Sequence, residues 1–555
     1  MKKKISVLLL IAMLFSMISL SACSKEATIE TFFLASDEPC VAVYTLNEDK
    51  LESQEPQLRG LEVIKSGKTF SKDEVNYVSF KLENSEDVPE YYVAEENTAD
   101  KYEACVKETQ KFVRTSTTLY ANAEDPSIAG FIKKGTPLEI TGFDFISWDG
   151  NVNMYQVSAN EQSGYVYPKY LANTQEEANA INTDYYELNK DAYYSYDLLG
   201  GTPENLDYFP FDKNLYITKE IPLDARTYYL NGGCVTKTQS GEYVIDNYIE
   251  LAKSCGCNAM VVDIKDGYMV YKSDVSKIYC PTAYENASMT KAEYKESIDR
   301  LKEAGIWTIG RIVVFKDSHF AADHPDVCIT SNGENLGWPS AFTRLTWEYN
   351  VKLAQEAATD IGFDEIQLDY VRFPENAYGL SSDSSTDFKN AFNEDKAETV
   401  QNFCMYASDN IHKAGAFFSV DVFGECSNGY ITAYGQYWPA ISNVVDVISS
   451  MPYVDHYGRG EDTWSNQYQT VYNWGCQASS AQEKTPNPAI TRTWISCYDL
   501  PMWDPYIIMD DTVLGNEIQG LWDAGVGYGG FMTWNGQSNL DIYYRVAPAF
   551  LRSYS

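Results

Sequence analysis

Short apolar runs alternate with longer amphipathic segments from residue 225 to near the C-terminus. The runs are wholly apolar or alternate with a period of two, which predicts β-strands, whereas the segments between them repeat with the period of a helix. We expect eight strands, with the sequences ARTYYLNG, AMVVDIKD, WTIGRIVVF, DEIQLDYV, FFSVDVFG, DVISSMPYV, TRTWISCYD and GYGGFMTWN. The intervening helices should lie within residues 243–257, 291–305, 343–361, 393–415, 436–444, 464–481 and 512–525.

Glycines support these helix ends, because Gly305, Gly362, Gly415 and Gly525 stand where helix C-caps should precede the next strand. Eight strands that alternate with helices predict an α/β fold, a (β/α)8 TIM barrel over residues 221–550, rather than an open doubly wound sheet. No GxGxxG phosphate loop opens this region, which argues against a nucleotide-binding domain.

The N-terminal part of the chain contains two series of strand-like runs separated by polar turns, over residues 38–100 and 110–173. Each series has a Lys-Ser-Gly or Lys-Lys-Gly turn and finishes in a Tyr-Val pair. This repetition predicts tandem small all-β barrels. Residues 174–220 are rich in Asn, Asp and Tyr, and we expect a linker with a short helix that packs on the next domain. We therefore expect both small barrels to be independent of catalysis, and a chain that starts near residue 215 to fold and to keep any activity on soluble oligosaccharide.

The second series resembles the bacterial Src homology 3-like domains of cell-envelope proteins, through Arg114, Gly135 and Gly164-Tyr165-Val166. The first series looks like a degenerate copy. In exported bacterial proteins this resemblance implies either peptidoglycan binding or a spacer role, and the residues do not separate the two.

The first residues predict export. Lys2, Lys3 and Lys4 precede an apolar run that is too short for a comfortable membrane span. The run Leu20-Ser21-Ala22-Cys23 resembles a bacterial lipobox. This implies a signal peptide over residues 1–22, lipidation of Cys23 and a tether over 23–37. The chain would then hang by lipid from the extracellular face of the cytoplasmic membrane. An ordinary signal peptide with a coincidental cysteine is the alternative.

Composition narrows the classes of function. The net charge is −36, from 79 acidic and 43 basic residues, and such a chain repels nucleic-acid phosphates. Tyrosine and tryptophan are abundant, and their rings can stack on sugars or fill a core. The 12 cysteines are scattered and the histidines number 4, so we expect neither a metal site nor a cofactor.

Candidate chemistry lies at the carboxyl ends of the predicted strands, which share one mouth in a TIM barrel. Glycoside hydrolysis needs one ionised carboxylate and one that keeps its proton. We expect Asp369, in IGFDEIQLDYVRFP, to be the nucleophile, held ionised by Arg311 and Arg372. The acid/base should be Asp421, in an apolar Val-Phe-Gly setting, or Glu425 beyond it.

The other polar and aromatic residues at these strand ends are expected to bind substrate: Asp263, Lys265, Arg311, Arg372, Tyr453, His456, Tyr457, Trp534 and Asn535. Structural roles compete with these assignments. Asp369 and Arg372 could simply close the strand mouth, and Asp263 and Lys265 could form an ion pair inside the barrel. His456 could be a hydrogen-bonded structural histidine, and Trp534 a core residue.

Residues 225–545 resemble a bacterial family named putative glycosyl hydrolase, which is expected to form a TIM barrel. The matching motifs are NAMVVDIKD at 258–266, TIGRIVVFKD at 308–317, GFDEIQLDYVRFP at 362–374, SVDVFG at 419–424, SSMPYVDHY at 449–457 and MTWN at 532–535. The resemblance implies a carbohydrate hydrolase but names no sugar. Asp369 and Asp421 lie inside matched motifs, whereas Glu425 lies beyond them and rests on spacing alone.

These observations predict a surface lipoprotein that hydrolyses glycosidic bonds in an envelope or extracellular polysaccharide. A carbohydrate-binding protein that kept the barrel without the chemistry is the alternative. A purely structural envelope spacer is a third reading.

Overall fold

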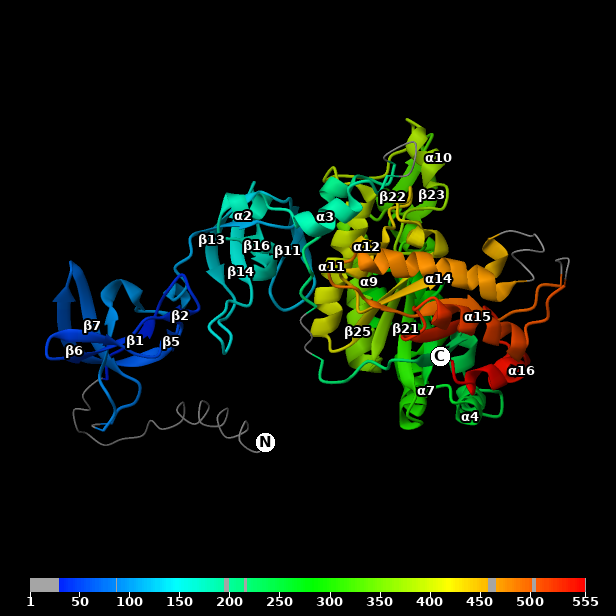
Figure 1. The fold of residues 1–555 in the computed structure, drawn as a ribbon, viewed down its shortest axis with the longest axis horizontal. Coiled ribbons are helices and arrows are strands. Elements are labelled where there is room, and N and C mark those ends of the chain that lie inside the picture. Colours follow the sequence, from blue (N-terminus) through cyan, green and yellow to red (C-terminus); the bar gives the residue numbers. More distant parts are fainter. Residues whose placement is uncertain are drawn as a thin grey trace. The chain divides into compact units, whose positions relative to one another are not determined.

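The computed structural model describes residues 29–85, 87–193, 199–213, 217–457, 466–501 and 506–554. The predicted leader and Cys23 lie outside this range. The chain divides into two compact units (Figure 1): unit 1 comprises Met1–Thr109 and Gly142–Asn153, and unit 2 comprises Gln110–Thr141 and Met154–Ser555. Among the described residues, no helix has the length and hydropathy that crossing a bilayer requires.

Unit 1 is built on a seven-stranded antiparallel sheet in the order β4-β3-β8-β7-β6-β1-β9. Its strands are β1 (Thr31–Leu34), β3 (Tyr44–Asn47), β4 (Lys50–Ser53), β6 (Glu62–Lys72), β7 (Val75–Lys81), β8 (Tyr91–Ala94) and β9 (Thr98–Ala99). The short strands β2 (Cys40–Val41) and β5 (Gln57–Leu58) pair separately. Phe32, Val63 and Phe80 belong to its core. The segment Gly142–Asn153 is anchored to this unit by Arg59, whose Nε donates to the Gly150 carbonyl at 2.8 Å.

Unit 2 begins with a second seven-stranded sheet, in the order β12-β11-β15-β14-β13-β10-β16. Its strands are β10 (Gln110–Val113), β11 (Thr117–Tyr120), β12 (Ile128–Ile132), β13 (Pro137–Phe143), β14 (Tyr155–Ala159), β15 (Gln162–Val166) and β16 (Leu171–Ala172). Buried Leu119, Phe131, Leu138 and Val157 fill its core. Small sheets therefore form where the two series of runs predict them, and their kinship with Src homology 3-like domains stays a prediction.

The second small sheet packs directly against the barrel helices, and the two belong to one compact unit. The rings of Tyr120 and Tyr406 lie 5.8 Å apart, and both side chains are buried. Asp409 accepts a hydrogen bond from the Tyr170 hydroxyl at 2.7 Å and pairs with Lys169. A compositional change along the chain did not reveal these contacts, because they join residues more than 200 positions apart.

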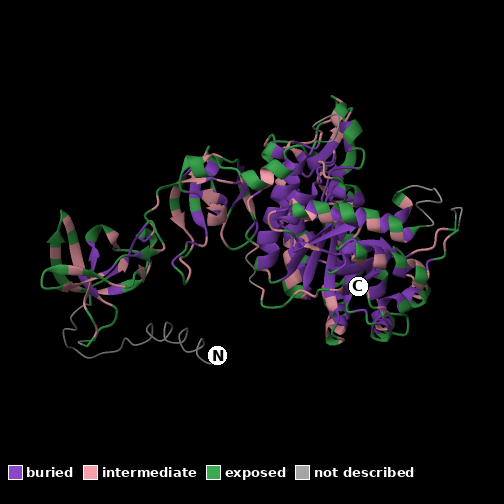
Figure 2. Cartoon of the chain, viewed as in Figure 1, coloured by how far each residue is buried: buried purple, intermediate pink, exposed green. Residues whose placement is uncertain are grey.

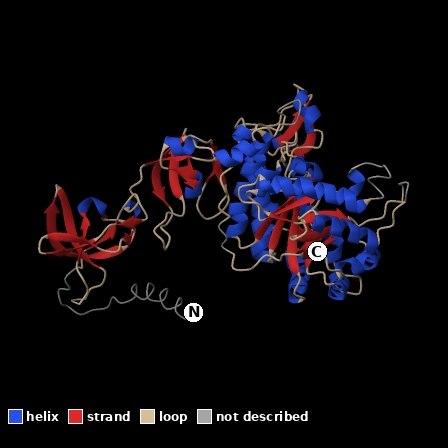
Figure 3. Cartoon of the chain, viewed as in Figure 1, coloured by secondary structure: helices blue, strands red, loops and turns tan. Residues whose placement is uncertain are grey.

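The rest of unit 2 confirms the predicted (β/α)8 barrel (Figure 3), a ring of parallel strands in the order β27-β26-β25-β24-β21-β18-β17-β29-β28. The strands are β17 (Ala225–Leu230), β18 (Ala259–Lys265), β21 (Trp307–Val313), β24 (Glu365–Asp369), β25 (Phe417–Phe423), β26 (Val447–Met451), β27 (Ile490–Thr491), β28 (Thr493–Ser496) and β29 (Gly530–Trp534). Because β27 bonds to β26 and β28 bonds to β29, these two pieces are one interrupted strand that closes the ring.

The interruption falls at Arg492, whose side chain enters the barrel. Its Nη1 donates to both carboxylate oxygens of Glu365 on β24, at 2.8 and 2.9 Å, and both side chains are fully buried. A buried charge is tolerated only with such a partner.

A helix overlaps every predicted helical segment: α4 (Ile245–Cys255), α7 (Lys291–Glu303), α9 (Arg344–Glu356), α11 (Lys396–Lys413), α12 (Trp438–Ser442), α14 (Gln467–Glu483) and α15 (Asp511–Asp523). The four expected cap glycines have φ angles of 78, 91, 83 and 78°. Helix α11 is buried along almost its whole length (Figure 2), because it lies between strand β25 and the second small sheet.

Short elements within the barrel loops were not predicted: α5 (Asp274–Tyr279), α6 (Pro281–Asn286), α8 (Ser318–Asp323), the hairpin β22 (Cys328–Ser331) and β23 (Glu334–Pro339), and α10 (Ala377–Ser382). The last helix, α16 (Leu540–Phe550), was also missed. The 174–220 segment holds two short helices, α2 (Gln175–Asn179) and α3 (Thr183–Asn189). Its Leu206 and Tyr208 pack with Ile431 and Tyr437 of the barrel.

Candidate active site

Arg311 is the electrostatic centre of the barrel mouth. Strand β21 carries it beside β18, where it lies opposite Asp263 in the parallel register. Its Nη1 donates to Asp263 at 2.7 Å, while Nε and Nη2 donate to the Asp369 Oδ2 at 3.1 and 2.7 Å. All three side chains are buried. A guanidinium can serve two carboxylates in this way because its donors form a rigid planar fork.

Arg311 also contacts the more exposed Asp266 at 3.3 Å, and its two buried carboxyl partners differ in their surroundings. Burial raises the pKa of Asp263 to about 6, against the opposing charge of Arg311. The second oxygen of Asp263 accepts a hydrogen bond from the Tyr229 hydroxyl. Asp369 instead uses its Oδ1 to accept the backbone N–H of Tyr370 at 2.6 Å, and it faces a pocket.

This pocket has a volume of about 210 Å³, and aromatic rings make up much of its wall. The lining includes Asp369 and Arg311 with Tyr370, Arg372, Phe423, Met451, Tyr453, His456, Trp494, Tyr498 and Trp534. Tyr370 has a φ of 56°, which is uncommon for an aromatic residue and is typical of constrained functional sites. We name this space the Asp369 pocket.

Asp421 lies next to Asp369 on the neighbouring strand. Leu368 and Val420 are register partners, so the following residues sit on strands about 4.8 Å apart. The Asp421 Oδ1 accepts the Trp494 Nε1–H at 2.7 Å, and its Oδ2 is buried without a hydrogen-bond partner among the described residues. Burial, and then the charge of Asp369, raise the pKa of Asp421 well above its usual range. The protonated form of Asp421 is therefore favoured beside Asp369, although Trp494, not Asp421 itself, lines the pocket.

Glu425 lies in a second, wider hollow of about 470 Å³ that Tyr457 also lines. Phe423, Met451 and His456 line both spaces, so the hollow adjoins the Asp369 pocket. The carboxylate is exposed and accepts hydrogen bonds from the hydroxyls of Tyr430 and Tyr434, at 2.7 and 2.8 Å. Glu425 therefore reaches solvent near Asp369, whereas Asp421 does not.

Arg372 lines the Asp369 pocket but does not hold Asp369, which corrects that part of the prediction. Its Nη2 donates to Glu375 at 2.6 Å, and its guanidinium lies 4.2 Å from the centre of the Phe423 ring and 4.7 Å from that of Tyr370. The sequence places Arg372 beyond the last residue of β24, so its direction was not fixed by the strand.

Lys265 is directed away from the mouth. A register shift between Asp263 and Lys265 places Lys265 opposite Ile312, so the two side chains no longer share a face. The Lys265 Nζ instead donates to Asp317 at 2.6 Å and to Asn350 at 2.8 Å. The predicted alternative of an Asp263–Lys265 ion pair is therefore wrong, since each has another partner.

Asn535 also serves the fold rather than the pocket wall. Its Nδ2 donates to the Cys497 carbonyl at 2.7 Å, and its Oδ1 accepts the Gln537 N–H at 3.2 Å. Trp534, directly before it, lines the pocket and lies 4.5 Å from Tyr229 between ring centres.

Tyr453 and His456 are brought together at the rim, with ring centres 5.4 Å apart. Five further lining residues were not predicted as site residues: Tyr370, Phe423, Met451, Trp494 and Tyr498. Trp494 follows Arg492 with the period of two that marks one face of a strand, and this signal could have identified it.

Three carboxylates elsewhere in the barrel come close enough together to suggest a cation site: Asp274, Glu356 and Asp360. The Lys291 ammonium already occupies that position, with its Nζ at 2.5, 3.2 and 2.8 Å from them. The cluster is therefore an ion-pair network.

Comparison with known proteins matches the barrel to one family. The family described as "Putative glycosyl hydrolase domain" matches residues 233–540. A hypothetical protein from Ruminiclostridium thermocellum ATCC 27405 is 30% identical over 35% of this chain and 97% of its own, with a TM-score of 0.29. No curated protein matches the chain.

Two glycoside hydrolase structures are also similar, at lower identity. The PgaB (BpsB) glycoside hydrolase domain from Bordetella bronchiseptica is 12% identical over 59% of this chain and 99% of its own, with a TM-score of 0.42. Alpha-L-fucosidase isoenzyme 2 from Paenibacillus thiaminolyticus is 13% identical over 59% of this chain and 48% of its own, with a TM-score of 0.39. Since the family match spans more than half of the chain and every barrel strand after β17, the chain belongs to the putative glycosyl hydrolase domain family.

Proposed function

We propose that this chain hydrolyses glycosidic bonds in a cell-envelope or extracellular polysaccharide. The observation that carries the proposal is the pair of neighbouring carboxyl groups, of which Asp369 is hydrogen-bonded to a guanidinium and Asp421 is buried against the Trp494 N–H. Surroundings that raise the pKa of one carboxyl group of such a pair suit that group to act as the acid of a glycosidase. The aromatic walls of the Asp369 pocket suit the faces of a sugar ring.

In the proposed reaction Asp369 supplies the ionised carboxylate that attacks the sugar or activates water. Arg311 stabilises the charge that Asp369 carries before the glycosidic bond breaks. The departing oxygen must receive a proton. The surroundings of Asp421 favour its protonated form, but Asp421 does not line the pocket, whereas Glu425 lines the adjoining hollow. Asp421 and Glu425 therefore remain competing acids.

An activity screen on envelope polysaccharides tests the proposal, with the wild type beside Asp369→Asn. We expect Asp369→Asn to lower turnover by about 10³-fold or more while the protein stays folded. Asp523→Asn, an exposed change on α15, is the matched control and should keep wild-type turnover. A folded Asp369→Asn protein with near wild-type turnover would refute the assignment.

A second candidate function is carbohydrate binding without hydrolysis. It is supported by the burial of Asp421 and by the engagement of both Asp369 oxygens in hydrogen bonds. Under this alternative the wild type binds polysaccharide and releases no sugar, and Asp369→Asn binds as well as the wild type does.

The N-terminal part is proposed to hold the enzyme at the extracellular face of the cytoplasmic membrane, through lipid on Cys23. We also propose that the small sheets contact peptidoglycan. Support comes from the segment Gly142–Asn153 of unit 1, where Trp148 is 89% exposed and Phe145 is 50% exposed. Exposed aromatic side chains of this kind are typical of binding surfaces.

A further inference from the structure

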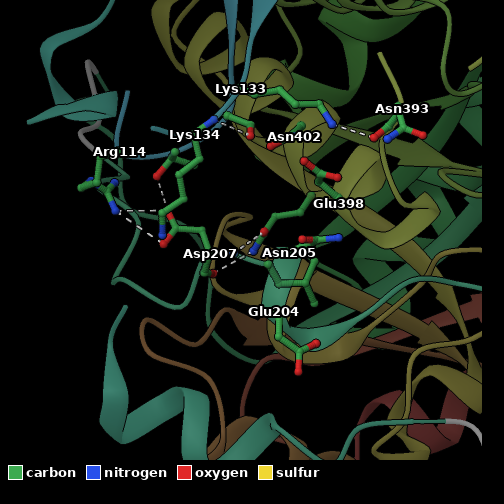
Figure 4. Close-up of a pocket in the computed structure, with 13 residues that line it drawn as sticks. Arg114, Lys133, Lys134, Glu204, Asn205, Asp207, Asn393, Glu398 and Asn402 are labelled. Atoms are coloured by element: carbon green, nitrogen blue, oxygen red, sulfur yellow. Dashed lines mark hydrogen bonds and ion pairs between the residues drawn. The ribbon is translucent and has the colours of Figure 1, made fainter. Parts of the chain in front are cut away.

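A polar pocket separate from the barrel mouth lies within unit 2, with a volume of about 340 Å³ (Figure 4). Its walls are the second small sheet, the segment around Glu204–Asp207 and the first turns of α11. Leu206 is the one apolar residue among the described residues that line it, and no aromatic ring does so. The volume is at the low end for small-ligand sites, which span about 300–1,000 Å³. Its ligand should therefore be small, polar and recognised by hydrogen bonds and charge.

Both signs of charge line this pocket. Figure 4 shows Arg114 and Lys134 on one side, whereas the Lys133 ammonium reaches across to Asn393 beside Glu398. The three cations all come from the small sheet, whereas the carboxylates come from the segment before the barrel and from α11. The pocket therefore offers both cations and carboxylates to a ligand.

The three cations are only partly neutralised. Arg114 pairs with Asp207 at 3.2 Å. Lys133 donates to the Asn393 carbonyl at 2.6 Å and Lys134 to the Ala180 carbonyl at 2.9 Å. Within the described part of the chain, neither lysine has a carboxylate at ion-pair distance. Two ammonium groups therefore remain able to attract an anionic group.

The pocket contains a carboxyl group, Glu398, that has no cation at ion-pair distance among the described residues. Glu398 is 8% exposed, and its Oε2 accepts the Asp395 N–H at 3.1 Å as part of the cap of α11. Burial raises the pKa of Glu398 to about 7, because the ionised form is poorly solvated there. An ammonium group brought in by a ligand would stabilise that form.

We propose that this pocket binds a small zwitterion of the amino-acid or short-peptide class, independently of the glycosidase site. Its carboxylate would lie against Lys133 and Lys134, and its ammonium group against Glu398 and Glu204. The amides of Asn205 and Asn402 line the space between and offer hydrogen bonds to the backbone and polar side chain of the ligand.

Calorimetric titration of the full-length chain with the dipeptide L-seryl-L-serine tests the proposal. Its side chains are uncharged, so its two ends carry the only charges. We expect saturable binding that weakens at least tenfold for the N-acetylated dipeptide, which lacks the ammonium group. The C-terminal amide, which lacks the carboxylate, should weaken to a similar degree. Free serine as a further titrant separates an amino-acid site from a peptide site.

Matched variants assign each end of the ligand. Glu398→Gln should bind the free and the acetylated dipeptide equally, and Lys133→Met with Lys134→Met should bind the free acid and the amide equally. Lys111→Met, which changes a lysine of the same sheet outside the pocket, should behave as the wild type. Glu204→Gln, at an exposed position, repeats the carboxylate test if Glu398→Gln fails to fold.

The proposal is overturned if the wild type gives no saturable binding of either the dipeptide or serine, or if the capped dipeptides bind as tightly as the free one. Unchanged selectivity in both the carboxylate and lysine variants also overturns it. These readouts are binding affinities, so they are independent of whether the barrel hydrolyses a polysaccharide.

Discussion

The indole of Trp494 donates its N–H to Asp421 at 2.7 Å, from the strand position that lines the Asp369 pocket. This bond leaves the other Asp421 oxygen buried without a partner among the residues that the structure describes. A carboxyl group in such a setting is kept protonated by desolvation. The protonated form of Asp421 is therefore favoured directly behind Trp494, which lines the pocket.

Asp421→Asn should lower turnover most on substrates with poor leaving groups, which depend on protonation, and much less on activated aryl glycosides. We expect a loss of about 10²–10⁴-fold on the former. The comparison is made by measuring kcat on both substrate types. Glu425→Gln is the matched rival, because it changes the exposed carboxylate that also adjoins the pocket. If Glu425→Gln shows the leaving-group dependence and Asp421→Asn does not, Glu425 is the acid.

Arg311→Met should destabilise the folded chain by about 3–5 kcal/mol, because it leaves Asp263 and Asp369 buried without their cation. Urea unfolding of the purified protein measures the change. Arg545→Gln breaks a more exposed pair with Asp499 and should cost about 1 kcal/mol or less. Equal effects of the two variants would contradict the central role given to Arg311.

The buried carboxyl group of Glu517 should make the free energy of unfolding of the protein depend on pH. It is buried on α15, its Oε2 accepts the Ser496 N–H at 3.0 Å, and burial raises its pKa to about 8. Its contribution to the free energy of unfolding is fully present below the unfolded pKa of about 4.3. That contribution is lost as the pH rises through about 8.

Glu517→Gln removes this titration. Relative to the wild type, the variant should gain a few kcal/mol of stability between about pH 4 and pH 9. Urea unfolding across this range measures the difference between the two proteins. Asp523→Asn, exposed on the same helix, should keep the wild-type pH slope. A difference between Glu517→Gln and wild type that does not change with pH would count against the buried carboxyl as its source.

Removal of the second small sheet should destabilise the barrel. A chain that begins near residue 215 loses Tyr120 and Tyr170, and so exposes Tyr406 and strips Asp409 of its partners. A chain that begins near residue 105 keeps these contacts and should unfold cooperatively with near wild-type stability. Thermal unfolding followed by circular dichroism compares the two. Equal melting temperatures would show that the small sheet is dispensable.

Cys23→Ser should release the protein from the membrane fraction, because lipidation requires the thiol. Fractionation of cells followed by immunoblotting measures the distribution. Cys40→Ser, at another cysteine near the N-terminus, should leave it unchanged. Membrane retention of Cys23→Ser equal to wild type would exclude the lipid anchor.

The barrel could be predicted because hydrophobic residues recur with different periods in its strands and helices, and because glycines follow several of its helices. Elements of about six residues or fewer within loops, such as α8 and the β22–β23 hairpin, were missed because they are too short to establish a period. The packing of the second small sheet on α11 is likewise a contact between distant residues with no local signal.

The candidate site could be predicted where the position of a residue in a strand determines the direction of its side chain. Asp263, Arg311, Asp369 and Asp421 lie on regular strands, and all four converge at the mouth. Lys265 points away from the mouth because a register shift places its side chain on the other face of the strand. The sequence carries no signal for this irregularity. Arg372 and Asn535 lie past the last strand residue, where turn geometry rather than alternation sets direction.

The Arg492–Glu365 pair has a consequence for how the barrel assembles. It joins the fourth strand to the interrupted seventh across the interior, at the strand through which the ring closes. A slip of one residue in that strand would turn Arg492 to the opposite face and leave Glu365 buried alone. Leaving the Glu365 carboxylate buried without its partner would cost about 3–5 kcal/mol, so a ring that closes in the wrong register is destabilised by that amount. The pair therefore selects one register of the interrupted strand against the neighbouring registers.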